Sequence, residues 1–445
     1  MPTVGLYTLG CKVSQYETEA IAEAFAKAGF TVLPYESVCD VYVINTCTVT
    51  AESDRKSRQI IRRAKKTNPD AVVCVTGCYA QTSPDEVAAV EGVDIVTGTA
   101  DKLSLVTRAA ARLAACAERE STEIAVGSLA GAPFEKMTVT HAPRTRIYVK
   151  IEDGCECRCT YCAIPGARGD VRSKLPADVI AEVEALSAAG TREVVLTGIE
   201  TASYGADFHD GYRLIDLVEE LDGRGSVDRI RFGSLTPELM SEDFVSRMAR
   251  LSSPVPHFHL SMQSGSDGVL RRMKRRYNRT QALAALARTR AAMPRVQFTT
   301  DLMVGFPGET EEEFSETLDF VRKARFLAVH VFAYSRRKNT PAATFPGQVP
   351  ESVKHERSAR LIALCREIGE EILSEIVSSG ETLPVVFETR EGEFFTGHSD
   401  TFIEVRVPSV RDLHGELHTV RPTSHEDGIL YGEIADVVPH KTAIK

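Results

Sequence analysis

Four cysteines crowd one short stretch of the chain, and their spacing suits the binding of iron. Cys155, Cys157, Cys159 and Cys162 fall within eight residues, and Cys155, Cys159 and Cys162 follow a Cys-x3-Cys-x2-Cys pattern. Three thiolates can hold three irons of a 4Fe-4S cluster, which normally takes four cysteines, so one iron stays open. The alternative is a zinc knuckle that uses all four thiols, although no second Cys or His pair nearby completes a usual zinc pattern. We predict an iron-sulfur site in which Cys157 takes no part.

Three more cysteines share one position relative to the expected strands. Cys11, Cys47 and Cys78 each come directly after an apolar run, in LGCKV, NTCTV and TGCYA. The C-terminal ends of parallel strands lie at one edge of a sheet, where such folds bind ligands, so the three thiols should converge. The alternative is a set of unrelated buried thiols. We assign that role to Cys39, Cys74, Cys116 and Cys365.

Length and composition favour a multidomain globular protein of the cytoplasm. At about 150 residues per domain, 445 residues make about three domains. The N-terminus shows no basic run before an apolar stretch, so neither export nor membrane spanning is expected. Eleven cysteines in a reducing compartment are better metal ligands than disulfide partners. The formal charge of −9 argues against a generally basic coat for nucleic acid, although local patches can still contact phosphates.

Alternating strand and helix patterns predict a small parallel α/β sheet in residues 1–130. A strand over 3–10 precedes an amphipathic helix with Ser14 at its N-cap and Gly29 at its end. Further strands are expected at 40–46, 71–77 and 93–99, and a helix from Asp101. The charged, Ala-rich stretch 114–128, with 131–137, is the best candidate for a linker.

A second series of strands predicts an open or partial parallel barrel in residues 141–375. Six apolar runs alternate with helical stretches, at 146–154, 192–199, 229–234, 257–262, 297–305 and 328–335. The loops after the strands of such a barrel hold the active site, and the cysteine-rich loop follows the first strand. A long helix is expected over 351–379. Alternating strands with Gly, Asp and Ser at the turns then predict a small all-β module in residues 380–445.

The motifs together resemble the radical S-adenosylmethionine (SAM) methylthiotransferases over nearly the whole chain. The segments that carry the resemblance are TLGCKVSQYETEA, NTCTVT, TGCYAQ, DGCECRCTYCAIPGARG, HLSMQSGSD, DLMVGFPGET and HVFAYSRRKNTPA. The resemblance implies that Cys155, Cys159 and Cys162, here called the radical triad, hold a catalytic 4Fe-4S cluster that cleaves SAM to a 5′-deoxyadenosyl radical. It also implies that Cys11, Cys47 and Cys78, the auxiliary triad, hold a second 4Fe-4S cluster. One SAM would donate a methyl group to sulfur and a second would supply the radical, while the last domain resembles an RNA-binding TRAM module.

The residues after the first cysteine indicate a substrate branch. Lys12, Val13, Gln15, Tyr16, Glu17 and Glu19 resemble the branch that modifies N6-threonylcarbamoyladenosine at position 37 of tRNA, next to the anticodon. The isopentenyladenosine branch usually reads Gln-Met-Asn there, and a branch acting on a ribosomal-protein aspartate reads Lys-Asn followed by Val-Asp-Ser. Both stay open as alternatives, as does a non-catalytic iron-sulfur RNA-binding protein. Ser14 and Asn339 depart from the family, which ordinarily has Asn and Gly at these positions.

Polar residues near the expected strand ends are the candidates for holding SAM. A capping or packing role is the alternative for each of them. They are Thr197, Gly198, Ser234, Gln263, Ser264, Asp301, Tyr334 and Ser335. Arg168 and Arg172, just after the cluster loop, could pair with a SAM carboxylate or with a substrate phosphate.

The expected partners are the anticodon stem-loop of tRNA and a reducing electron donor such as flavodoxin or ferredoxin, with no membrane and no stable protein partner. Basic stretches at 54–66 and 271–279 could neutralise phosphates, although charged helix faces are often only solvated. The β-module is acidic, with twelve Asp and Glu against six Lys and Arg from Glu381 onward. Its Phe394, Phe395 and Phe402 could stack on bases, although strand alternation would bury some of them.

Overall fold

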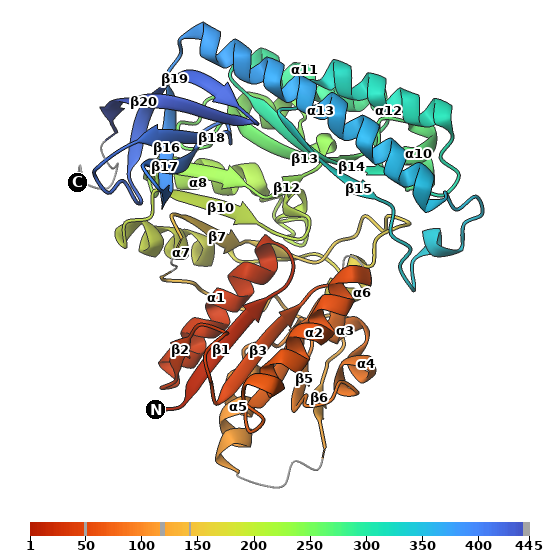
Figure 1. Cartoon of the computed structure of the whole chain (residues 1–445), viewed down its shortest axis with the longest axis vertical. Helices are drawn as coiled ribbons and strands as arrows, with labels where there is room; N and C mark the ends of the chain where they lie inside the picture. The colour runs from red at the N-terminus through yellow and green to blue at the C-terminus, as the bar shows by residue number, and fades with distance from the viewer. Residues whose placement is uncertain (49–50, 116–120, 142–143, 439–445) are drawn as a thin grey trace.

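The computed structural model describes residues 1–48, 51–115, 121–141 and 144–438. In Figure 1 an N-terminal α/β domain lies below a larger barrel, and a C-terminal β-module packs beside that barrel. No helix within these ranges has both the length and the apolar character that crossing a bilayer requires. Cys116, one of the cysteines predicted to be unrelated to the sites, lies outside the described residues.

The N-terminal domain is the predicted parallel sheet. Its strands run in the order β2-β1-β3-β4-β5-β6, and every residue of β3 and β4 is buried because helices cover both faces. The side chains of α1 and α5 pack on one face, and those of α2 to α4 on the other. The strands are β1 (Thr3–Thr8), β2 (Thr31–Leu33), β3 (Val41–Thr46), β4 (Val72–Gly77), β5 (Ile95–Thr97) and β6 (Glu123–Ala125); the helices are α1 (Lys12–Lys27), α2 (Ala51–Thr67), α3 (Cys78–Thr82), α4 (Pro84–Ala88) and α5 (Ser104–Ala114).

Two local predictions in this domain are wrong. Ser14 is not the N-cap: α1 begins at Lys12 with Cys11 in the cap position, and Ser14 is buried in the first turn, where its carbonyl accepts from Asn45. The stretch predicted as a linker contributes β6, because residues 123–125 pair with the free edge of β5.

The central region confirms the predicted open parallel barrel. One sheet has the order β11-β10-β7 and the other β12-β13-β14-β15, so β7 and β15 are the two outer strands. The strands are β7 (Arg146–Lys150), β10 (Glu193–Thr197), β11 (Arg229–Phe232), β12 (Ser234–Leu235), β13 (His257–Gln263), β14 (Gln297–Val304) and β15 (Ala328–Ala333), with a small antiparallel pair of β8 (Glu152–Asp153) and β9 (Arg172–Ser173). In Figure 1, α1 lies along β7 at this open side.

Helices surround the barrel and share one hydrophobic core with its strands. They are α6 (Ile164–Arg168), α7 (Pro176–Ala188), α8 (Leu214–Arg224), α9 (Glu242–Met248), α10 (Asp267–Arg272), α11 (Arg279–Ala292) and α12 (Glu311–Ala324), with short turns η1 (Thr201–Ser203), η2 (Pro237–Leu239) and η3 (Pro341–Thr344). The long helix α13 spans Glu351–Ser379, as predicted, and leads into the last domain.

The C-terminal module is a closed barrel in the order β16-β17-β18-β20-β19, which confirms the all-β prediction. Its strands are β16 (Leu383–Glu391), β17 (Phe394–Ser399), β18 (Glu404–Pro408), β19 (Leu417–Glu426) and β20 (Ile429–Val437).

Two of the three phenylalanines predicted to stack on bases serve the fold instead. Phe395 is 2% exposed in the module core, as strand alternation requires. Phe402 stacks on His257 of β13, with ring centroids 4.8 Å apart, and lies under the guanidinium groups of Arg146 and Arg231. It therefore holds the module against the ends where the barrel strands begin.

Candidate active site

The radical triad lies on the loop between β8 and α6, and that loop is fixed by the backbone. The Cys155 N–H donates to the Gly169 carbonyl at 3.0 Å, and the Thr160 N–H donates to the Met273 carbonyl at 3.1 Å. Gly154 has φ +93, and a Cβ there would lie 1.9 Å from the Asp170 carbonyl oxygen, so only glycine fits. The loop geometry thus depends on contacts within the barrel.

The auxiliary triad is assembled by the sheet. Thr46 and Gly77 are register partners at the ends of β3 and β4, so Cys47 and Cys78 leave adjacent strands side by side. Cys11 arrives from β1, the next strand, through Gly10. Gly10 has φ +122, and a Cβ there would lie 3.1 Å from the Cys47 Cβ, so glycine permits the close approach. The structure brings together three thiols that are far apart in sequence.

The donor set around these thiols fits iron-sulfur ligation. Cys78 Sγ accepts from Arg168 Nε at 3.3 Å, and Cys159 Sγ accepts from Arg275 Nη1 at 3.5 Å. Cys155 Sγ accepts from the Cys157 N–H at 3.4 Å. Hydrogen bonds and cations directed at sulfur stabilise thiolates, the form that binds iron. Both triads therefore offer soft sulfur ligands in cationic surroundings.

Cys157 lies close to Cys155 of the radical triad and to a carboxyl group. Its Sγ lies 3.8 Å from Glu200 Oε2, and ligand atoms of Cys155, Cys157 and Glu200 lie within 4.8 Å of one another, close enough for a single metal ion. The hydrogen bond with Cys155, together with burial, raises the pKa of the Cys157 thiol. Burial raises the pKa of Glu200 to about 7. Burial also raises the pKa of Cys162, to about 12, so the pKa of Cys157 does not separate it from the triad, and its exclusion stays a prediction.

Several of the predicted SAM residues lie at the strand ends on the side of the cysteine loop. Thr197 is buried at the end of β10, and Gly198 follows it against Glu152, whose Oε2 would lie 2.4 Å from a Cβ on that glycine. Ser234 is exposed on β12. Gln263 ends β13 with φ +64, a left-handed conformation that costs energy outside glycine and that clusters at functional sites. These four remain predictions.

The other SAM candidates have protein partners. Ser264 is 1% exposed and hydrogen-bonds with Thr317 of α12, and Tyr334 packs in an apolar cluster with Phe306. Asp301 is paired with His259 at 3.3 Å and with His330 at 3.2 Å inside the barrel. Ser335 follows β15 and is half-buried. Asn339, where the family often has glycine, has φ +65, a conformation that asparagine tolerates.

Arg168 lies in a contact that the sequence did not predict. Its side chain is completely buried, and its guanidinium pairs with Glu17 of α1 and Asp153 of β8 as well as with Cys78. The suggestion that it pairs with a SAM carboxylate or a substrate phosphate is therefore replaced by this protein contact. Arg172 likewise donates to the Arg168 carbonyl at 2.8 Å and lies 3.5 Å from Asp153.

The wider cluster joins the two domains. Glu17 also accepts from Lys102 and Lys150, and Lys150 lies 2.6 Å from Asp153. The one sequence signal was a lysine and two acids within the apolar run RIYVKIED, since charge in a buried strand needs a partner.

A second unpredicted feature is a cation next to the auxiliary triad. Lys12 follows Cys11, is half-buried, and has no ion-pair partner within the described ranges. It lies within electrostatic reach of Arg146, Arg231 and Asp301, and burial followed by the two arginines lowers its pKa.

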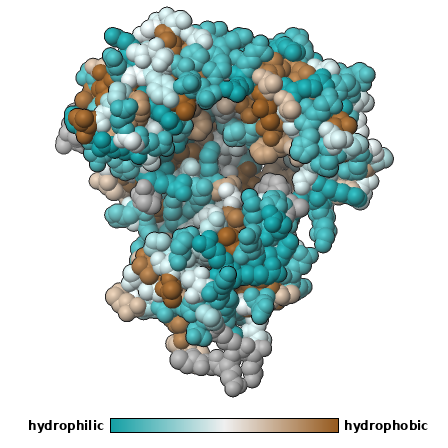
Figure 2. Space-filling model, viewed as in Figure 1, coloured by the Kyte–Doolittle hydropathy of each residue, from teal (hydrophilic) through white to brown (hydrophobic). Residues whose placement is uncertain are grey.

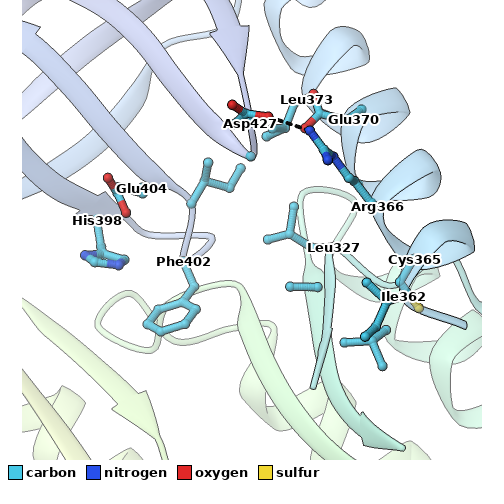
Figure 3. Close-up of a pocket in the computed structure, with 15 residues that line it drawn as sticks. Leu327, Ile362, Cys365, Arg366, Glu370, Leu373, His398, Phe402, Glu404 and Asp427 are labelled. Carbon is cyan, nitrogen blue, oxygen red and sulfur yellow. Dashed lines mark hydrogen bonds and ion pairs between the residues drawn. The ribbon is translucent and has the colours of Figure 1, made fainter. Parts of the chain in front are cut away.

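The elements next to the two triads pack on each other across the domain junction. Helix α3, which begins with Cys78, packs against α6, which follows Cys162. Figure 2 shows the surface hollowed where the N-terminal domain meets the barrel. A separate cavity of about 460 Å³ lies between β15, α13 and the C-terminal module, with Phe402 and His398 on the side opposite α13 (Figure 3). Cysteines of neither triad line that second cavity, so it is not the reaction site.

Comparisons with known proteins agree with this geometry. Residues 149–321 match the family model described as the Radical SAM superfamily, and residues 3–98 match Uncharacterized protein family UPF0004. The threonylcarbamoyladenosine tRNA methylthiotransferase MtaB of Bacillus subtilis is 43% identical over 95% of this chain and 94% of its own length. The chain belongs to the radical SAM tRNA methylthiotransferases. As a methylthiotransferase it is a transferase enzyme, and its family implies SAM and 4Fe-4S cofactors.

Two other relatives and one solved structure are similar to this methylthiotransferase. MtaB of Thermotoga maritima is 36% identical over 97% of the chain and 96% of its own length. A tRNA-2-methylthio-N(6)-dimethylallyladenosine synthase of Acidothermus cellulolyticus is 36% identical over 94% of the chain and 84% of its own length. The radical SAM methyltransferase TsrM of Kitasatospora setae shares the fold with a TM-score of 0.57 at 15% identity, covering 88% of this chain and 79% of that one.

Proposed function

We propose that this methylthiotransferase converts N6-threonylcarbamoyladenosine at position 37 of tRNA to its 2-methylthio derivative, using two 4Fe-4S clusters and two SAM molecules. One observation carries the proposal: two separate sulfur triads lie on packed, facing elements, with Cys78 at the start of α3 and Cys162 just before α6. A single metal site would need only one of them.

The reaction explains why the chain holds two triads. An ordinary thiolate does not attack an unactivated aromatic C–H bond, whereas a carbon radical can be formed there and captured by sulfur. A cluster held by Cys155, Cys159 and Cys162 would, with SAM, supply the radical chemistry, and a cluster held by Cys11, Cys47 and Cys78 would supply the sulfur. Such chemistry needs a site from which water is excluded, because water would divert reactive species. Gly10 and Gly154 set the two cysteine loops in place.

Lys12 supports the threonylcarbamoyl substrate. That substituent carries a carboxylate, whereas an isopentenyl group is apolar, and a site that pairs a polar group discriminates strongly against an analogue lacking it. Of three neighbouring cations, Arg146 and Arg231 pair with Glu388 and Glu193, whereas Lys12 has no ion-pair partner among the described residues. The MtaB relatives, up to 43% identical, support the same substrate.

Two basic segments support tRNA binding around the junction. Helix α2, which starts shortly after Cys47, exposes Lys56, Arg62, Arg63 and Lys66. The segment after β13 exposes Arg271, Lys274 and Arg276 beside the Arg275 contact with Cys159. Such groups neutralise phosphates. On the β-module, Phe394 forms an edge contact with Tyr431 at 5.9 Å and is only half-buried, so it is the phenylalanine left for base stacking. A small reducing protein such as flavodoxin or ferredoxin would supply electrons.

The test is an anaerobic assay with two tRNAs, one carrying N6-threonylcarbamoyladenosine and one carrying isopentenyladenosine, followed by digestion and mass analysis. We expect methylthiolation of the first only. The variant Lys12→Met should lose at least tenfold in kcat/KM on that tRNA, which corresponds to about 1.4 kcal/mol, while still forming 5′-deoxyadenosine. Methylthiolation of the isopentenyl tRNA alone would contradict the substrate and support the second candidate, which the relatives named as dimethylallyladenosine synthases favour.

A further inference from the structure

Arg168 contacts both halves of the molecule and a cysteine at once. It ends α6, six residues after Cys162, and its side chain is completely buried. Its Nε donates to Cys78 Sγ at 3.3 Å, and its Nη2 donates to Glu17 Oε2 at 3.1 Å. Its Nη1 also reaches Asp153 Oδ2 at 3.2 Å. The planar guanidinium therefore joins the auxiliary triad to the element that follows the radical triad.

Buried cations gather around Arg168. Lys102, Lys150, Arg168 and Arg172 contact the carboxylates of Glu17 and Asp153. Buried charge is costly unless it is paired. Cys78 Sγ is a further partner of Arg168, so an anionic thiolate at the auxiliary triad would add negative charge in direct contact with this guanidinium.

We propose that Arg168 is a positioning residue for the auxiliary cluster, orienting Cys78 and raising the reduction potential of the cluster that this triad holds. This inference rests on the proposed function, since it takes the triad as a cluster site. An N–H donor and a positive charge at a ligating sulfur stabilise the reduced, more negative state. The donor comes from the barrel, so the auxiliary site is completed only when the two domains are docked.

A second buried cation provides a matched control. Lys174 is 1% exposed, pairs with Glu182 and donates to the Met137 carbonyl at 2.9 Å. It also reaches the Tyr16 hydroxyl of α1 at 3.5 Å, so it links the same two domains. No cysteine is among its contacts in the described ranges. Removing its charge disturbs docking and stability without touching a cluster ligand.

The experiment uses the full chain with Cys155, Cys159 and Cys162 replaced by Ala, so that only the auxiliary cluster reports. Arg168→Gln, Arg168→Lys and Lys174→Gln are added singly, and the reduction potential is measured by EPR-monitored titration, with iron content and melting temperature alongside. We expect Arg168→Gln to shift the potential to more negative values and Arg168→Lys, which keeps the charge, to shift it less. Lys174→Gln should lower the melting temperature and leave the potential unchanged.

The outcomes separate the inference from the proposal beneath it. A parent that holds no cluster contradicts the proposed function itself. A parent with about four irons whose potential is the same in all three variants contradicts the role of Arg168 alone. If Arg168→Gln fails to fold, Arg168→Lys decides: an unchanged potential and EPR spectrum overturn the inference, and a shifted potential supports it.

Discussion

The two cysteine triads are built in opposite ways. The radical triad lies within eight residues of one loop, and its arginine donor, Arg275, belongs to the same barrel. The auxiliary triad comes from the ends of three adjacent strands, and its donor, Arg168, comes from the other domain. The radical site should therefore tolerate damage to the N-terminal domain, whereas the auxiliary site depends on the sheet, on the barrel and on their docking.

The largest expected effect is that of removing the radical triad. Replacement of Cys155, Cys159 and Cys162 by Ala should lower the iron content from about eight to about four per chain, because each triad holds one cluster. It should also abolish both 5′-deoxyadenosine and product formation. Iron analysis of the anaerobically reconstituted protein checks this. Retention of all the iron would show that these cysteines hold no cluster.

The asymmetry between the sites can be probed at Glu17. In Glu17→Gln the cations Lys102, Lys150 and Arg168 lose their shared carboxylate. The free energy of unfolding should therefore fall by about 3–5 kcal/mol. Iron should be lost from the auxiliary site before the radical site. Urea unfolding followed by iron analysis measures both.

Glu19→Gln is the control for that change. Glu19 lies on the same helix as Glu17, but its partner Arg144 is 45% exposed. The substitution should therefore lower the free energy of unfolding by less than about 1 kcal/mol. Equal losses from the two variants would contradict the role given to the buried cluster.

The buried carboxylate of Glu193, which has no cysteine partner among the described residues, provides a reference for the stability effects. Burial would raise the pKa of Glu193, but Arg229 and Arg231 outweigh it and lower the pKa to about 2. Because the folded pKa lies below the unfolded value of 4.5, the pair stabilises the protein above pH 4.5 and loses that effect as the pH falls toward 2. Glu193→Gln should destabilise the protein by about 3 kcal/mol at pH 7.

The free energies of unfolding of wild type and Glu193→Gln should differ by about 1 kcal/mol less at pH 4 than at pH 7. Urea unfolding of both proteins at the two pH values measures it. Iron content of the folded variant should be unchanged, since Glu193 contacts no cysteine in the described ranges. A difference independent of pH would contradict the ionised pair.

The smallest effect is expected at Cys157. Replacement by Ala should leave iron content and SAM cleavage within about twofold of wild type, because three thiolates suffice for the open cluster. Because ligand atoms of Cys155, Cys157 and Glu200 lie close enough to share a metal ion, this variant tests whether Cys157 is a ligand. Loss of the cluster in this single variant would support the alternative of a metal site that uses all four cysteines of the loop.

The sequence predicted what depends on local pattern. Apolar runs located the six barrel strands, and helical periodicity placed α13 at Glu351–Ser379. The positions of Cys11, Cys47 and Cys78 directly after apolar runs predicted their meeting at one sheet edge, because parallel topology fixes where strands end.

Long-range charge pairing escaped prediction. Glu17, Lys102, Lys150, Asp153 and Arg168 come from separate segments, and a charged residue on a helix usually faces solvent. The role of Phe402 could not be predicted because it lies in a turn with φ +71, where strand alternation does not determine the direction of its side chain. Residue type alone predicts an N-cap at Ser14, whereas the helix begins at Lys12 with Cys11 in the cap position.

The division of labour between the triads is tested most directly by the variant in which Cys11, Cys47 and Cys78 are all Ala. With SAM, reductant and tRNA carrying N6-threonylcarbamoyladenosine under anaerobic conditions, mass analysis should detect 5′-deoxyadenosine but no methylthiolated nucleoside, because the radical site lies wholly in the barrel and the sulfur site does not. Full formation of the methylthiolated product by this variant would contradict the two-cluster account.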